Sequence, residues 1–238
     1  MWKETEKGTP QGAGISPLLA NIFLHYVFDL WAHQWRQRHA RGSVILVRYA
    51  DDFVMGFECE DDARRMRLDL EERLAKFKLA LHAEKTRLLE FGRMPARQRE
   101  RAGLRRLSTF AFLGFTHYCG WTRYGASIVK RKTERMRMTR KLRRLRIDTK
   151  RRRHAPLSEQ HRWLCSVLHG HYAYYGLPSN HRSLSAFRHQ VMRLWHRALR
   201  KRSQRGLPWN RFRQLLELFS LPEPRITHSQ EALAVGLG

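Results

Sequence analysis

Apolar residues recur at helical spacing in the first part of the chain. Between positions 18 and 31 they fall in adjacent pairs that repeat every four residues, which predicts a helix that begins near Ser16, with this serine as its N-cap and the apolar stripe in the core. The stretch 61–79 also repeats at helical spacing, and Asp61 and Asp62 suit the positive end of a helix. Two amphipathic helices are therefore expected before residue 80.

Short runs of apolar and β-branched residues predict strands. Two of these runs, 44–49 and 53–57, are separated only by an aspartate pair, so they are expected to form a hairpin with a tight turn. Further strands are expected at 86–91, 110–115 and 124–130. The first part of the chain is therefore predicted to mix an antiparallel sheet with helices that pack on it.

From residue 130 onward the pattern is helical and basic. Helices are expected over 130–147, 158–173, 183–202 and 208–219, with Gly-Leu-Pro breaks between the later ones. The predicted fold class is α+β, with a sheet-and-helix domain over 1–128, an all-α basic domain over 129–220 and a C-terminal tail over 221–238.

The charge is strongly basic and is concentrated in the second half. The formal net charge is +26, and residues 121–238 hold 27 Lys and Arg against 6 Asp and Glu. Such an excess repels itself unless a polyanion screens it, which favours a nucleic-acid partner over the rival, an anionic membrane surface. No apolar run of about 18 residues that could span a membrane is present. The three cysteines form no CxxC pair, so a reducing, cytoplasmic setting is expected.

The hairpin segment VILVRYADDFVMGF, at 44–57, places Asp51 beside Asp52 at the expected turn. Two adjacent carboxylates repel each other, and a hard divalent cation such as Mg²⁺ relieves that repulsion. The alternative is a solvated Asp-Asp turn, because aspartate is a favoured turn residue. The dipeptide alone leaves both interpretations open.

The residues around the pair add a family resemblance. The sequence YADD at 49–52, with a strand expected on each side, resembles the YxDD box of reverse transcriptases. Other pieces follow in the family's order: GTPQGAGISPLLANIFLH at 8–25, HAEKT at 82–86, FLGF at 112–115, HGHYAYYG at 169–176, RKRSQRG at 200–206 and LPEPRITH at 221–228. Together they resemble a group II intron-encoded reverse transcriptase/maturase. The resemblance implies a partial palm over 1–128, followed by a helical thumb/maturase (domain X-like) region.

The resemblance also implies roles for individual residues. Asp51 and Asp52 match the carboxylates that hold catalytic Mg²⁺ in a two-metal site, and Lys85 matches a lysine that assists pyrophosphate departure. Taken alone, Lys85 reads as a solvated lysine at a strand edge. The positions that match the nucleotide- and template-binding segment are Pro10, Gln11, Gly12, Tyr49 and Ala50. Without the family, Gln11 could simply hydrogen-bond the turn that leads into the following helix.

The loop that grips the primer in the family matches Phe112, Leu113 and Gly114, although Phe112 and Leu113 alone would be read as core residues. The basic helical part is expected to bind RNA. A basic run can also be a plain solvated face, but this one is combined with aromatic residues that could stack on unpaired bases. The expected RNA-binding residues are Arg131, Lys132, Arg135, Arg143 and Arg144.

The family's palm uses a third carboxylate on a strand well before Gly8, and no residue here matches it. The two-metal site is therefore expected to be incomplete, and this chain alone a poor polymerase, unless a second copy or an upstream fragment completes it. The expected partners are template or intron RNA, a DNA primer or target, and dNTPs. Three functions remain open: an RNA-directed DNA polymerase that also acts as a maturase, an RNA-binding maturase without polymerase activity, and a truncated remnant of a mobile element.

Overall fold

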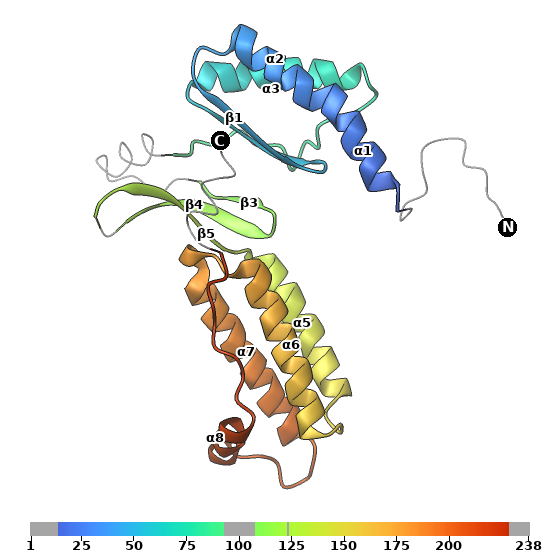
Figure 1. Cartoon of the computed structure of the whole chain (residues 1–238), viewed down its shortest axis with the longest axis vertical. Helices are drawn as coiled ribbons and strands as arrows, with labels where there is room; N and C mark the ends of the chain where they lie inside the picture. The colour runs from blue at the N-terminus through green and yellow to red at the C-terminus, as the bar shows by residue number, and fades with distance from the viewer. Residues whose placement is uncertain (1–13, 93–107, 123, 229–238) are drawn as a thin grey trace, which may run out of the picture. The chain divides into compact units, whose positions relative to one another are not determined.

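The structure is a computed structural model that describes residues 14–92, 108–122 and 124–228 (Figure 1). The chain divides into two compact units, one up to Leu89 and one from Glu90. Both units combine helices with a small antiparallel sheet, which confirms the α+β class. The division falls well before the predicted boundary at residue 128, because the three-stranded sheet lies in the same unit as the basic helices. None of the helices in the described ranges is long and apolar enough to cross a membrane.

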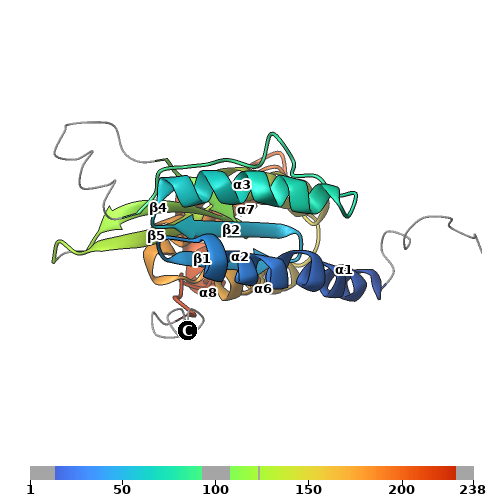
Figure 2. The ribbon, with the colours of Figure 1, turned by 90° about the horizontal axis from the view of Figure 1, so that it is seen from above.

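The first unit is a hairpin backed by helices. Its elements are α1 (Ser16–Leu24), the π-helical segment η1 (His25–Asp29), α2 (Leu30–His39), β1 (Val44–Tyr49), β2 (Asp52–Phe57) and α3 (Glu60–Ala75). Figures 1 and 2 show α2 and α3 side by side on one face of the hairpin. Phe28 and Trp35 from the helical side meet Phe53 and Phe57 of β2. The predicted hairpin is confirmed, with Asp52 as the first residue of the second strand.

Three local predictions for the first unit are wrong. Within the apolar stripe at 18–31 only Val27 and its neighbour Phe28 are buried, and α1 has no buried residue; Leu18 is 59% exposed and Ile22 48%. Spacing predicts that apolar residues share a face, but it cannot tell whether another element covers that face. Ser16 is not the N-cap, because the amides of the first turn already bond the carbonyl of Ile15.

The third wrong prediction is the strand at 86–91. No strand is assigned there, and residues 87–91 carry no regular secondary structure. A strand needs a partner to hydrogen-bond, and β-propensity alone does not supply one.

The second unit joins a three-stranded sheet to a helical bundle. Its elements are β3 (Phe110–Phe112), β4 (Phe115–Trp121), β5 (Ser127–Thr133), α5 (Arg135–Arg151), α6 (Leu157–Tyr175), the short 3-10 helix η2 (Pro178–Asn180), α7 (His181–Arg200) and α8 (Trp209–Leu218). Helices α5, α6 and α7 run alongside one another (Figure 1). The four predicted helices in this part of the chain are confirmed, but the predicted start of the first is wrong. Helix α5 begins at Arg135, because residues 130–133 belong to β5.

The bundle core is aromatic and aliphatic, with Leu184, Phe187, Trp195 and Phe212 fully buried. The Trp195 indole N–H donates to Gln160 Oε1 at 3.0 Å, so the buried polar atom is satisfied.

The sheet is joined to the bundle through Asn180, whose buried amide group bonds both the backbone N–H and the hydroxyl of Thr133 on β5. The same amide also donates to the carbonyl of Tyr175 at the end of α6. Sheet and bundle are therefore hydrogen-bonded together within one unit.

The segment 221–228, predicted as part of a tail, packs on the bundle over its described length. Leu221 is buried, and Arg188 of α7 donates to its carbonyl and to that of Pro222. Thr227 Oγ1 donates to the carbonyl of Tyr172, and the Thr227 N–H donates to that of Gly176. The extended segment is thus tied to α6 and α7 (Figure 1). The rest of the predicted tail lies outside the described residues.

Candidate active site and nucleic-acid surface

The tip of the first unit's hairpin is a two-residue turn. Tyr49 pairs with Asp52 in the register, so Ala50 and Asp51 form the loop between the strands. Ala50 has φ +54°, a left-handed backbone conformation that L residues adopt at a cost of about 1 kcal/mol or more. A tight two-residue loop of this kind holds the backbone of Asp51 close to the strand ends.

An arginine on the helix-facing side of β1 holds this turn. Arg48 donates through Nε and Nη2 to the two carboxylate oxygens of Asp29, at 2.7 and 2.6 Å. Its Nη1 donates to the carbonyl of Ala50 at 2.8 Å and to Asn21 Oδ1 at 3.0 Å. The Arg48 side chain is only 15% exposed. The hydrogen bonds and charge of Arg48 lower the pKa of Asp29, against the opposing effect of its burial, so the pair stays ionised at neutral pH.

Sequence reasoning missed Arg48 and Asp29, although a signal for both was present. Each is a charged residue at an inward position of an otherwise apolar pattern, Arg48 in VILVRY and Asp29 in YVFDLW. Charged residues are rarely buried unless they are paired, so two such positions in neighbouring elements indicate an ion pair.

The two predicted metal ligands lie at the exposed tip of this hairpin. Asp51 and Asp52 are both exposed, and within the described ranges neither carboxylate takes part in a hydrogen bond or ion pair. Free carboxylate oxygens are the ligands that Mg²⁺ prefers, so the donor set fits this cation. The set is incomplete, because among the described residues no group of three His, Cys, Asp or Glu side chains could hold a metal ion.

Of the other predicted palm residues, Tyr49 and Lys85 are exposed, and the remaining ones near the start of the chain are not described. Tyr49 lies on the same exposed face of the hairpin as Asp52 and is 65% exposed. Lys85 lies in an exposed turn, where its N–H bonds the carbonyl of His82, and no hydrogen bond joins it to either aspartate. Pro10, Gln11 and Gly12 lie outside the described residues.

The predicted primer-grip residues form a second tight turn, in the second unit. Leu113 and Gly114 have φ +49° and +78°, which is typical of a two-residue hairpin loop between Phe112 and Phe115. The Leu113 carbonyl accepts a hydrogen bond from the hydroxyl of Tyr174 at 3.0 Å. Helix α6 therefore holds the turn and offsets the cost of a leucine with positive φ.

The predicted RNA-binding residues follow β5 and α5. Lys132, Arg135, Arg143 and Arg144 are exposed, whereas Arg131 is half-buried, with its backbone N–H and carbonyl both bonded to the hydroxyl of Ser179. Helix α5 buries only Leu145 and Thr149, so most of its basic side chains face solvent. This arrangement leaves the cations accessible to phosphate groups.

One histidine of the HGHYAYYG segment lies in the core of the second unit. His171 is buried and stacks on Phe187 with ring centroids 3.7 Å apart. Burial, together with the nearby charge of Lys141, lowers the pKa of His171 to about 3. His171 is therefore neutral at pH 7.

A comparison with known protein families matches the first part of the chain. Residues 1–117 match the family model described as reverse transcriptase (RNA-dependent DNA polymerase). The match includes the aspartate pair, Lys85 and the Leu113-Gly114 turn, and it supports a reverse transcriptase assignment for this part of the chain. A comparison with curated proteins finds no match.

Proposed function

We propose that the chain is part of a group II intron-type reverse transcriptase, which copies RNA into DNA and also binds its intron RNA as a maturase. The observation that carries the proposal is the turn held by Arg48, which presents, inside the matched segment, two carboxylates that bond no other residue in the described ranges. Support for the group II type comes from motifs beyond residue 117. Two of them contact each other, since Thr227 and His228 of LPEPRITH bond backbone carbonyls of HGHYAYYG.

In this proposal Asp51 and Asp52 hold Mg²⁺, which would supply positive charge for the attacking hydroxyl and the departing pyrophosphate. Arg48 fixes the backbone before Asp51 and so positions the carboxylates. Tyr49 and Ala50 contact the primer end and the incoming dNTP, and Lys85 neutralises charge on the departing pyrophosphate.

In the second unit, the turn Phe112-Leu113-Gly114 supports the primer strand. The exposed arginines of α5 bind phosphates of the template or intron RNA.

The test is primer extension on an RNA template with Mg²⁺, comparing the unmodified chain with Asp51→Asn. We expect any extension to fall by about 100-fold or more in the variant, because a lost metal ligand removes stabilisation of the transition state. Asp61→Asn is the matched control, since Asp61 is an exposed aspartate of the same unit and lies outside the hairpin. Equal activity in Asp51→Asn and the unmodified chain would contradict the catalytic assignment.

The second candidate is an RNA-binding maturase without polymerase activity. It is favoured by the incomplete ligand set among the described residues and by a second unit that has its own core and basic surface. No extension, together with tight RNA binding that weakens steeply with salt, would select this function. Extension that appears only after mixing with a second fragment or copy would mean that the third carboxylate is supplied separately.

A further inference from the structure

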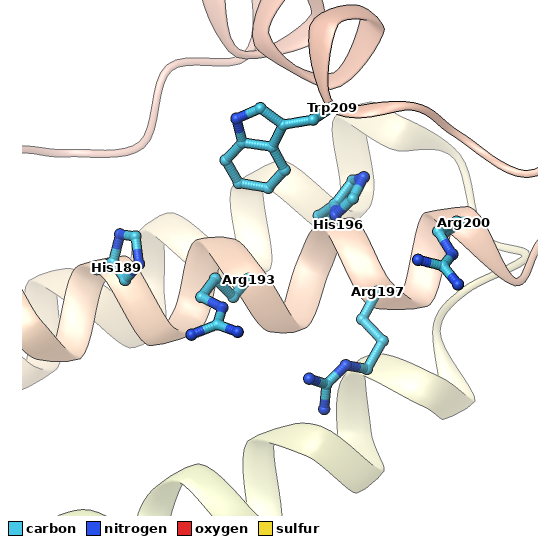
Figure 3. A pocket seen from close by; sticks show the side chains of 6 residues that line it. All are labelled: His189, Arg193, His196, Arg197, Arg200 and Trp209. Atoms are coloured by element: carbon cyan, nitrogen blue, oxygen red, sulfur yellow. The ribbon is translucent and has the colours of Figure 1, made fainter.

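The second unit contains a pocket that no comparison assigns, and of its lining residues only Arg200 belongs to one of the quoted motifs, RKRSQRG at 200–206. It lies between α7 and the start of α8 and has a volume of about 340 Å³. Figure 3 shows the arginines and histidines coming from α7, with the indole of Trp209 reaching over from α8. The lining residues are His189, Arg193, His196, Arg197, Arg200 and Trp209.

The aromatic side of the pocket is held rigidly. The Trp209 indole meets the His196 ring edge-on, with centroids 4.7 Å apart, and packs against the buried Phe212 at 5.3 Å. His196 is itself fixed, because its Nε2 donates to the carbonyl of Leu207 at 2.8 Å. Trp209 nevertheless remains 39% exposed, whereas Trp195 of the neighbouring core is fully buried. A rigid, partly exposed indole in a pocket is a stacking surface for a planar ring.

The other side of the pocket is cationic and unpaired. Arg193, Arg197 and Arg200 are exposed, and within the described part of the chain none of their guanidinium groups forms a hydrogen bond or ion pair. Their spacing of four and three residues on one helix makes them repel each other. Arg188 of the same helix is different, because its guanidinium bonds Glu223 and two carbonyls of the segment 221–228. The three pocket arginines therefore lack the partner that an anion would supply.

The volume of the pocket and the chemistry of its lining residues together indicate the class of ligand. A pocket of this volume is at the small end of the range for ligand sites and suits one nucleotide rather than a duplex. A base can stack on an aromatic side chain only when it is unpaired and turned out of its helix. Because Nε2 of His196 donates to the Leu207 carbonyl, Nδ1 of the neutral ring is an acceptor for a base N–H. A phosphate ion alone would use only the arginines.

We propose that this pocket binds one unpaired nucleotide of an RNA strand, with the base stacked on Trp209 and the flanking phosphates paired with Arg193, Arg197 and Arg200. The inference deepens the RNA-binding part of the proposed function and rests on it, but it does not depend on polymerase activity. An acidic peptide is the competing occupant, and it would use the cations without the indole.

The experiment measures the affinity of the full chain for a labelled 12-nucleotide RNA strand and for the matching duplex, as a function of salt. Trp209→Ala is expected to weaken single-strand binding by about tenfold, the typical effect of losing one stacked base, and to leave duplex binding unchanged. Trp209→Phe should restore most of the single-strand affinity. Arg193→Ala with Arg197→Ala should make the dependence of affinity on salt shallower. Arg182→Ala, an exposed arginine of α7 outside the pocket, is the control for loss of one charge.

An RNA strand of the same length without bases tests the stacking on Trp209 in the unmodified protein. This test is needed because Trp209→Ala also removes the packing of Trp209 against Phe212. This strand should bind about tenfold more weakly than the normal strand, and Trp209→Ala should not weaken it further. Equal affinity for strands with and without bases, or full competition by an acidic peptide against both, would overturn the stacking site in favour of a simple anion site. If Trp209→Ala leaves salt-sensitive single-strand binding unchanged, the pocket assignment is wrong but the RNA-binding part of the proposed function is supported. If the unmodified chain binds no RNA, both the pocket assignment and the RNA-binding function are wrong.

Discussion

At the scale of single residues, the hairpin tip shows how a strained backbone can be held in place. Ala50 takes a positive φ that L residues disfavour, and its carbonyl receives a hydrogen bond from Arg48. The same guanidinium is paired with Asp29 through two further hydrogen bonds. The conformation before Asp51 is thus maintained by an ion pair that reaches into the helical side of the unit, not by the turn sequence alone.

Replacing this arginine tests that arrangement. Arg48→Met should lower the free energy of unfolding of the first unit by about 2 kcal/mol, because it removes charge-assisted hydrogen bonds and leaves the Asp29 carboxylate with only the exposed His25 beside it. Urea denaturation followed by circular dichroism measures the change. Arg64→Met is the control, since Arg64 makes an exposed pair with Glu60 within one helix and should cost less than about 0.5 kcal/mol. Equal effects of the two substitutions would contradict the anchoring role.

The buried His171 gives a pH dependence at the same scale. Its pKa is about 3 in the folded chain, against the ordinary 6.5 expected when unfolded, so below pH 6.5 the unfolded state binds the extra proton. The stability of the second unit should therefore fall with pH between 6.5 and 3, with a slope approaching about 1.4 kcal/mol per pH unit. The pKa of Lys141 is also lowered by burial, but from an ordinary value of 10.5, so its effect belongs to higher pH.

Denaturation of His171→Gln at pH 4.5, 5.5 and 6.5 measures this slope. Glutamine keeps an acceptor for Lys141 but carries no charge at any pH, so the slope should become shallower even though lost stacking on Phe187 lowers stability throughout. His169→Gln, an exposed histidine of the same helix, should leave the slope unchanged. An unchanged slope in His171→Gln would mean that the imidazole is not buried in its neutral form.

At the scale of elements, the spacing of apolar residues predicted which helices and strands form, but not always which other element packs against them. Helices α3, α5, α6, α7 and α8 and the hairpin were predictable, because their periodicity and breakers are local. The strand at 86–91 and the buried stripe on α1 were not, because both depend on a partner element that no local pattern describes. The packing of 221–228 was missed for the same reason. Its contacts with Tyr172 and Arg188 link residues more than 30 positions apart.

Two glycines of the HGHYAYYG segment give a matched test of that packing. A Cβ on Gly176 would clash with Thr227 Oγ1 and the carbonyl of Tyr172, whereas one on Gly170 of α6 would meet nothing within 4 Å. Gly176→Ala should therefore destabilise the second unit by about 1–3 kcal/mol and loosen 221–228. Gly170→Ala should stabilise it by about 0.5–1 kcal/mol through helix propensity. Thermal unfolding and the rate of proteolysis near residue 225 measure both effects; stabilisation by both substitutions would contradict the packing of this segment.

At the scale of the whole molecule, each unit has its own core. In the first, Trp35, Met66 and Leu70 are buried between helices and hairpin, and in the second Phe187 and Trp195 are buried in the bundle. The aspartate pair was recognisable from sequence because its motif is contiguous. The pocket at Trp209 was not, because the tryptophan and the arginines come from separate helices that meet only in the fold.

Separate cores predict separate unfolding transitions. Arg48→Met should shift only the transition of the first unit and Gly176→Ala only that of the second. The double variant should show the sum of both shifts, because the effects of substitutions that share no partners are additive. Asp29 adds a second criterion: its lowered pKa means that the first unit loses stability only as pH falls below about 4, whereas His171 weakens the second unit already below 6.5. Calorimetry at decreasing pH should therefore show the transition of the second unit moving to lower temperature before that of the first. A single transition that both substitutions shift equally, at every pH, would show that the two units unfold as one.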